Sequence, residues 1–263
     1  MPQLLLLEWM KVRRYRTFWV LLILFAALLT LLYTGVSTGV ISLGAGDLNL
    51  LGKAYNFSSI WGDLGFYASY FIIVITILMA ILVTNEFQYR THRQNIIDGW
   101  TRLEFYHAKW QVLISLSLTV TLFTFLLGLV TGIASGIPIG TVGQGLEKMA
   151  WLFLSCMDYL GFALLLSVLL KRSGIAIGIL MAYCMLLEPI LHSILLFFYR
   201  MPYGDLFLPL QCSDELLPMK AAKLMRTAVQ VASPADWQYA VATAGWVLVF
   251  YLVGRWKMQR GDW

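Results

Sequence analysis

Six long apolar runs constrain this chain more than any other feature of its sequence. They lie at about residues 18–34, 66–84, 111–135, 149–170, 174–199 and 239–254. A helix needs roughly 20 mostly apolar residues to cross the hydrocarbon core of a bilayer, and each run is close to that length. Within lipid, a helix satisfies all its backbone hydrogen bonds in one segment. The sequence therefore predicts an all-α fold: a polytopic membrane protein with six transmembrane helices in a single transmembrane domain, residues 1–263.

The composition argues against a soluble enzyme and against a nucleic-acid-binding protein. Only 13% of the residues are charged, about half of the ~25% that is usual in soluble domains. The longest polar segment, 200–237, is too short to enclose a core of its own. The three cysteines follow no metal or disulfide spacing, so neither a metal site nor catalytic residues are expected. The net charge of +5 reflects how Lys and Arg are distributed between the apolar runs, not a nucleic-acid surface.

Basic residues gather on one side of the six runs. If the N-terminus is cytoplasmic, most of the 19 Lys and Arg residues fall in cytoplasmic segments, as the positive-inside rule requires. Most of the exceptions lie in the long loop 200–237, where that rule has least force. Both termini are therefore expected in the cytoplasm and loop 200–237 outside it. The exceptions are Lys53, Lys148, Arg200, Lys220, Lys223 and Arg226.

The segment before the first run, "LLLLEWMKVRRYR", alternates apolar and basic residues. Such a pattern favours a helix lying in the membrane interface, with Trp9 and Tyr15 at headgroup level. Arg13, Arg14 and Arg16 would then contact anionic lipid. A frayed basic tail is the alternative.

The connection between the second and third runs, 85–109, is the most polar long stretch inside the chain. Thr91 and Gln94 have the spacing of a capping box, and so do Thr101 and Glu104. Gly99 stands where a glycine ends a helix. The sequence predicts a short cytoplasmic helix at about residues 92–98, a turn, and a newly capped helix that enters the third run.

A helix of that length is too short to be stable alone. Arg93, Gln94 and Asp98 offer polar contacts, while Ile96 and Ile97 offer apolar surface. Docking onto a protein partner is one interpretation of this surface. The other is a capped hairpin that lies on lipid headgroups.

The stretch "NEFQYRTHRQNIIDGWTRLEFYHAKW" resembles the cytoplasmic connection between the second and third spans of type-2 ABC exporter permeases. Glu86, Thr91, Arg102 and Lys109 fall on the family pattern. Arg90 stands where the family has a glycine, which leaves open whether the sharp backbone turn of that family forms here. The basic ending "GRWKMQRGDW", the six spans and the N-terminal interfacial helix complete the similarity.

The resemblance implies a dimer of permease subunits in the bacterial cytoplasmic (inner) membrane, each seated on a cytoplasmic ABC ATPase. The short helix would be a coupling helix that docks on that ATPase. This chain has no G-x-x-x-x-G-K-[ST] phosphate loop, so ATP and Mg²⁺ are expected in the partner, and no cofactor in this chain. The family exports drugs, peptides, lipids and polysaccharides, and no residue here selects one. The residues expected to couple to the ATPase are Glu86, Thr91, Arg93, Gln94, Asp98 and Arg102.

Three ionisable residues lie within the apolar runs: Asp158 in the fourth, and Glu188 and His192 in the fifth. Charges at such depth are costly, so they usually face a cavity or a partner. Glu188 and His192 are four residues apart, on one helical face, and are expected to share a proton or a hydrogen bond. The three residues line or gate the export path in one interpretation, and form structural hydrogen bonds in the other. Pro189 predicts a kink.

Two further patterns bear on packing and on competing functions. Gly128, Gly132, Gly136 and Gly140 recur every four residues, a spacing that lets helices approach closely. An ion-coupled secondary transporter that uses Asp158, Glu188 and His192 is the alternative function. Such carriers often contain inverted repeats, and no clear repeat is present. An intramembrane enzyme has no supporting metal motif.

Overall fold

The computed structural model describes residues 2–38, 41, 56–91, 97, 99–201, 203–218 and 234–260. Among these residues, six helical segments are long and apolar enough to cross a membrane, and none of the described residues forms a strand. The predicted all-α fold with six spans is confirmed. The six segments are α2 (Arg16–Ser37), α3 (Phe57–Gln88), α5 (Arg102–Ala134), α6 (Glu147–Leu170), a broken helix over Ser173–Phe198, and α11 (Asp236–Arg260).

Several helices extend beyond the apolar runs that predicted them. Helix α3 begins at Phe57 because Asn56 and Ser59 form a capping box, in which the Asn56 side chain accepts from the Ser59 N–H at 2.8 Å. Helix α5 begins at Arg102, well before the apolar run at 111. Hydropathy locates only the apolar part of each helix, whereas the caps determine where the helix begins.

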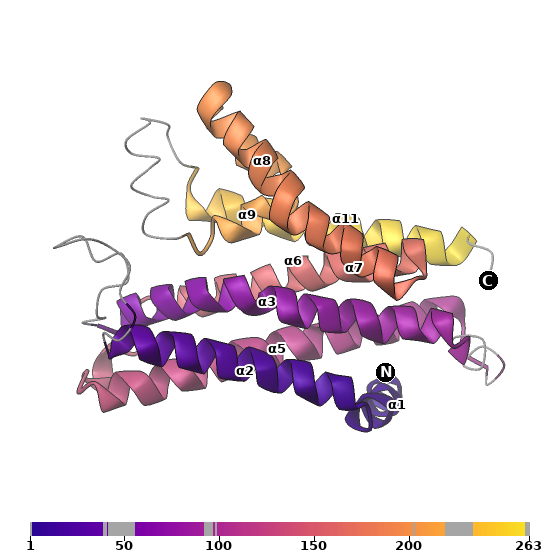
Figure 1. Cartoon of the computed structure of the whole chain (residues 1–263), viewed down its shortest axis with the longest axis horizontal. Helices are drawn as coiled ribbons and strands as arrows, with labels where there is room; N and C mark the ends of the chain where they lie inside the picture. Colours follow the sequence, from indigo (N-terminus) through magenta and orange to yellow (C-terminus); the bar gives the residue numbers. More distant parts are fainter. Residues whose placement is uncertain are drawn as a thin grey trace.

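The spans run alternately back and forth, so that both chain termini lie at the same end of the bundle (Figure 1). We call this the terminal end; it also carries the connection between α3 and α5. The opposite end, which carries residues 135–146 and 199–218, is called the loop end. Helices α3 and α6 are the most enclosed: 50% and 61% of their apolar windows are buried, against 17% for the broken helix. The core is therefore built around α3 and α6.

The segment before the first span forms α1 (Pro2–Arg13), which lies across the terminal end rather than along the bundle (Figure 1). Trp9 and the three arginines predicted to face lipid are exposed. Tyr15 differs from the expectation, since its hydroxyl accepts a hydrogen bond from the Asn85 side chain of α3 at 3.0 Å. The contact of α1 with lipid stays a prediction.

The fifth span is broken into α7 (Ser173–Ala182), a π turn η2 (Tyr183–Leu187), α8 (Glu188–Ser193) and a second π turn η3 (Ile194–Phe198). Pro189 explains the first π turn, because proline lacks an N–H and its ring crowds the carbonyl four residues earlier. Figure 1 shows α8 leaving the bundle beyond this point. Its position brings Glu188 and His192 toward the chain that follows the span.

Two of the four repeated glycines let α5 approach α3 closely. A Cβ on Gly128 would clash with the Trp61 ring, and one on Gly132 would lie 2.5 Å from Phe57 Cε1. Gly136 and Gly140 face open space instead. The close packing expected from the glycine spacing is thus present at Gly128 and Gly132, within one subunit.

Two short elements follow the fifth span, within the loop predicted at 200–237. They are η4 (Gly204–Phe207) and α9 (Gln211–Asp214). Residues 219–233 of that loop lie outside the described residues.

Candidate functional site

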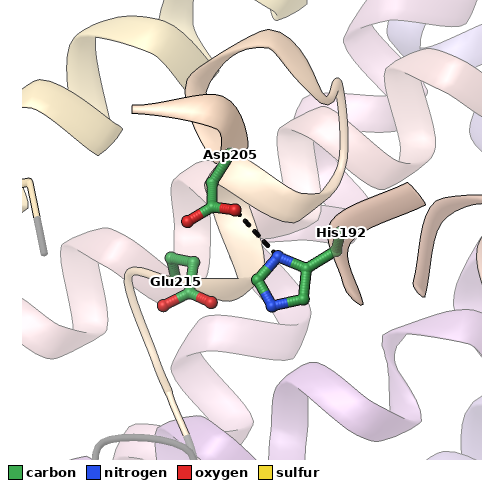
Figure 2. A group of neighbouring side chains, drawn as sticks. All are labelled: His192, Asp205 and Glu215. Atoms are coloured by element: carbon green, nitrogen blue, oxygen red, sulfur yellow. Dashed lines mark hydrogen bonds and ion pairs between the residues drawn. The ribbon is translucent and has the colours of Figure 1, made fainter. Parts of the chain in front are cut away.

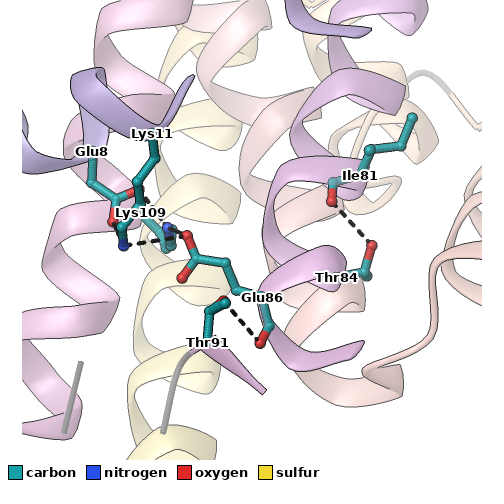
Figure 3. A network of polar contacts seen from close by, with 7 residues as sticks. All are labelled: Glu8, Lys11, Ile81, Thr84, Glu86, Thr91 and Lys109. Atoms are coloured by element: carbon teal, nitrogen blue, oxygen red, sulfur yellow. Dashed lines mark hydrogen bonds and ion pairs between the residues drawn. The ribbon is translucent and has the colours of Figure 1, made fainter. Parts of the chain in front are cut away.

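An ion cluster at the terminal end joins three helices that are distant in sequence. Lys109 of α5 places its Nζ 2.5 Å from Glu8 Oε2 of α1 and 2.5 Å from Glu86 Oε1 of α3. Lys11 of α1 adds a second ammonium, 3.0 Å from Glu8 Oε1 and 3.7 Å from Glu86 Oε1. Figure 3 shows these side chains converging from α1, α3 and α5. We call these four residues the ion cluster.

The charges of the ion cluster are buried and must therefore be paired. The side chains of Lys109 and Glu8 are only 3% and 2% exposed, whereas Lys11 is 39% exposed. A buried charge is stable only when it is paired, and here two carboxylates balance two ammonium groups. Burial alone would raise the pKa of Glu8, but the charges of Lys109 and Lys11 outweigh it and hold that pKa below its usual value. Glu8 is therefore ionised at neutral pH.

The connection between α3 and α5 leaves the ion cluster through a tight turn. Arg90 has a φ of 57°, in the left-handed region. The sequence left this turn open, because the glycine of the family is missing. The turn nevertheless forms, with the arginine held in this conformation at a cost of roughly 1–2 kcal/mol. The Thr91 hydroxyl donates to the Glu86 carbonyl at 3.4 Å just beyond the turn.

The end of the connection matches the sequence prediction. Gly99 has a φ of 96°, as expected for a glycine that ends a helix. The Thr101 N–H donates to Glu104 Oε2 at 2.7 Å, and the Glu104 N–H donates to Thr101 Oγ1 at 3.2 Å. This capping box starts α5 and is confirmed. The Thr91–Gln94 box and most of the predicted helix at 92–98 lie outside the described residues.

The residues predicted to couple to an ATPase therefore fall into two groups. Glu86 is turned into the bundle, where it binds Lys109. Arg102 is exposed, and its guanidinium donates to the Gln259 carbonyl of α11 at 3.5 Å. The others besides Thr91, namely Arg93, Gln94 and Asp98, lie outside the described residues.

At the loop end, Glu188 and His192 bind the following loop rather than each other. Glu188 Oε1 accepts hydrogen bonds from the N–H groups of Leu210 and Gln211, at 2.7 and 2.9 Å, and so caps the start of α9. His192 Nδ1 lies 2.8 Å from Asp205 Oδ1 of η4. The expected hydrogen bond between Glu188 and His192 is wrong, because the loop supplies a closer partner to each.

Asp158 of α6 is fully buried beside this loop. Neither of its carboxylate oxygens has a hydrogen-bond partner in the described part of the chain. The nearby Ser213 hydroxyl donates to the Leu210 carbonyl at 2.7 Å instead. Asp158 is thus a buried polar group held in place by packing, the kind of group that a functional role can explain.

A cavity of about 570 Å³ lies between α3, α6, the broken span and the loop. Its walls combine aromatic rings and carboxyl groups, including Tyr70, Tyr159, Asp214 and Glu215. The Tyr159 hydroxyl donates to both carboxylate oxygens of Asp214, at 2.9 and 3.0 Å. Burial raises the pKa of Asp214 to about 7, although the Tyr159 hydrogen bond lowers it. Asp158, Glu188 and His192 lie behind this wall and do not line the cavity.

Sequence reasoning missed four acidic residues that the structure places in these sites: Glu8, Asp205, Asp214 and Glu215. Glu8 is the single acid before the first apolar run, but its partner Lys109 lies 101 residues away. The other three occur in an irregular, proline-containing loop whose sequence has no periodicity to place them. Only their concentration within a short stretch signals a site.

Comparison with known proteins supports the sequence resemblance. A family model described as ABC-2 family transporter protein matches residues 4–198 of the chain. The match spans α1, the first five spans and the connection between α3 and α5. No curated protein matches the chain.

The ion cluster predicts unequal effects of removing its two lysines. Lys109→Met leaves two buried carboxylates with one half-exposed counter-charge, and we expect a loss of about 3–5 kcal/mol of stability. Lys11→Met is the matched control, because an exposed pair contributes only about 0–1 kcal/mol. Thermal unfolding of the purified protein in detergent measures both. Equal losses would contradict a buried cluster centred on Lys109.

The same cluster predicts acid sensitivity. Because the pKa of Glu8 is lower in the folded than in the unfolded state, its ionisation stabilises the fold above the unfolded value of about 4.5. This contribution is lost as the pH falls through the lower folded pKa. Below about pH 4.5, we expect the free energy of unfolding to fall less steeply with decreasing pH for Glu8→Gln than for the wild type. An unchanged pH dependence would contradict the assignment.

Proposed function

The chain belongs to the ABC-2 family of transporter membrane proteins, and we propose that it is the membrane subunit of an ATP-binding-cassette exporter. It couples ATP hydrolysis by a separate cytoplasmic ATPase, which binds ATP and Mg²⁺, to export of a cargo. The observation that carries this proposal is the family match, which includes the whole connection between α3 and α5.

We place the terminal end in the cytoplasm of a bacterial cell and the loop end outside its inner membrane. Both termini and the connection between α3 and α5 share the terminal end (Figure 1). That end also carries most of the Lys and Arg residues of the chain, which favours its retention in the cytoplasm.

A second permease subunit and membrane lipids are the proposed neighbours of the exposed apolar surface. The broken fifth span exposes Leu186, Ile190 and Phe197, which are unfavourable in water. Lipid and a second subunit are both apolar enough to cover them.

Coupling is proposed to pass from the segment around residues 91–102 into the bundle through the ion cluster. Arg93, Gln94 and Asp98, with Thr91 and Arg102 beside them, contact the ATPase. Glu86 does not touch the ATPase but transmits its movement, because it ties the end of α3 to Lys109 of α5 and thereby to Glu8 of α1. The three helices then move as one body.

The cavity at the loop end is the proposed exit vestibule for cargo. Glu188 holds α9, and α9 carries Asp214 into the cavity wall. His192 holds η4 through Asp205, and Asp158 lies behind the wall. Glu188 and His192 therefore gate the path by positioning the loop, and Asp158 contributes a carboxyl group beside it that is unpaired within the described residues. Two carboxyl groups between aromatic rings favour a cargo that combines an apolar body with a cationic group.

The coupling proposal is tested with the complex purified from native membranes into nanodiscs. The wild-type complex is expected to hydrolyse Mg-ATP. In the double variant Arg93→Glu, Asp98→Arg, the ATPase activity of the complex should fall by about tenfold or more. Like charges that face each other at an interface cost several kcal/mol, and ~1.4 kcal/mol is a factor of ten.

The control for this experiment is Arg14→Glu, an exposed residue at the same end but outside the connection. It should keep the activity of the wild type. A wild-type complex without ATPase activity, or a double variant as active as the control, would contradict the proposed function.

The vestibule proposal is tested through Cys184, which lines the cavity, whereas Cys156 and Cys212 are buried. A membrane-impermeant maleimide added to intact cells should label the wild type and not Cys184→Ser. Glu188→Ala should increase labelling because α9 loses its cap. Glu188→Gln should change it little, since its amide oxygen still accepts from the two N–H groups. Labelling that requires broken membranes would overturn the proposed orientation.

A further inference from the structure

Three side chains at the loop end converge as ligands of a metal ion do. His192 comes from α8, Asp205 from η4, and Glu215 directly follows α9. One potential ligand atom from each lies within 4.8 Å of the other two, and Figure 2 shows the imidazole and both carboxylates facing a common space. We propose that His192, Asp205 and Glu215 form a Zn²⁺ site at the loop end of the protein.

The distances between the ligand atoms allow a Zn²⁺ site to form after small side-chain movements. Zn²⁺ binds nitrogen and oxygen ligands at about 2.0–2.2 Å, so tetrahedral ligand atoms stand roughly 3.4 Å apart. His192 Nδ1 and Asp205 Oδ1 are 2.8 Å apart, at hydrogen-bond distance. Small rotations of these side chains are sufficient to exchange that hydrogen bond for two metal bonds. The ligand atoms of all three residues lie within 4.8 Å of one another, so reaching the tetrahedral spacing shortens any of these distances by at most about 1.4 Å.

Burial and charge distinguish this group from ordinary surface acids. Asp205 is 2% exposed and His192 is 18% exposed, and Glu215 is half-buried. The carboxylates of Asp205 and Glu215 lie beside the His192 imidazole, and a divalent cation bound between them would offset the charge of the two carboxylates.

A supporting contact holds one ligand in place. The Tyr239 hydroxyl of α11 donates to Asp205 Oδ2 at 3.3 Å, leaving Oδ1 directed at His192. Hydrogen bonds of this kind orient carboxylate ligands in metal sites and increase their affinity. A fourth helix thus contributes to the geometry.

The ligand types select the ion. An imidazole with two carboxylates suits Zn²⁺ and similar transition metals, whereas Ca²⁺ and Mg²⁺ prefer oxygen ligands alone. Three protein ligands leave a fourth position for water, and the partial exposure of His192 keeps the group accessible.

The three ligands stand on three segments, so one ion would join the loop to the broken fifth span. Its predicted effect is to stabilise the loop end, where π turns and the short elements η4 and α9 stand in place of one continuous α-helix. This inference stands independently of the proposed export function. It also departs from the sequence expectation of no metal site, because no spacing motif connects the ligands.

Zn²⁺ binding to the full-length protein, purified in detergent and treated with a chelator, tests the proposal. Titration calorimetry should show one Zn²⁺ per chain at this site and a rise in melting temperature, which Mg²⁺ and Ca²⁺ do not reproduce. Glu215→Gln and His192→Gln should each weaken binding by about 100-fold, since loss of an outer partner alone costs about 10–100-fold. Tyr239→Phe should show that smaller loss.

Matched controls are His107→Gln and Glu147→Gln, which lie outside the site. Both should bind Zn²⁺ as the wild type does. If a ligand variant fails to fold, Co²⁺ added to the wild type provides the second measurement, with visible absorption bands typical of tetrahedral nitrogen and oxygen coordination. Wild-type protein that binds no Zn²⁺, ligand variants that bind it normally, or Co²⁺ without such bands would overturn the proposal.

Discussion

The terminal end of this protein depends on the pairing of Lys109 with Glu8 and Glu86. An ammonium group buried to this extent is stable only beside carboxylates, and both carboxylates come from other helices. Helix α1 therefore cannot leave the bundle without exposing Lys109 to an apolar environment with half of its counter-charge. This single requirement joins the segment before the first span, the end of α3 and the start of α5, and it lies beside the connection that the proposed function assigns to the ATPase.

At the loop end, buried polar groups also need partners, and the backbone and side chains of the following loop supply them. Glu188 directs its charge at two backbone N–H groups, and His192 binds Asp205, so that buried polar groups of the broken span are satisfied by the loop that follows it. Asp158 lacks such a partner within the described residues. The loop end is thus positioned by a few directional contacts, beside a cavity with acidic walls.

Local patterns in the sequence predicted local structure well. Apolar runs located all six spans, and the Thr101–Glu104 spacing located the start of α5. Contacts between distant segments were not accessible: nothing near Glu8 indicates Lys109, and four-residue spacing wrongly paired Glu188 with His192. The left-handed conformation of Arg90 could not be decided from the sequence either, because a residue with a side chain adopts it only when the surrounding structure imposes it. The sequence thus predicted where helices lie along the chain, but not which distant residues contact one another.

We propose that α1, α3 and α5 move together because the ion cluster joins them. Met10 of α1 and Tyr89, the residue that ends α3, are both exposed. Spin labels at these two positions therefore disturb little of the core. Their distance should be measured by pulsed electron resonance in the ATPase complex, with and without bound ATP. If the helices move together, the distance distribution is the same in both states and broader in Lys109→Met. A distance that changes with ATP in the wild type would contradict the proposal.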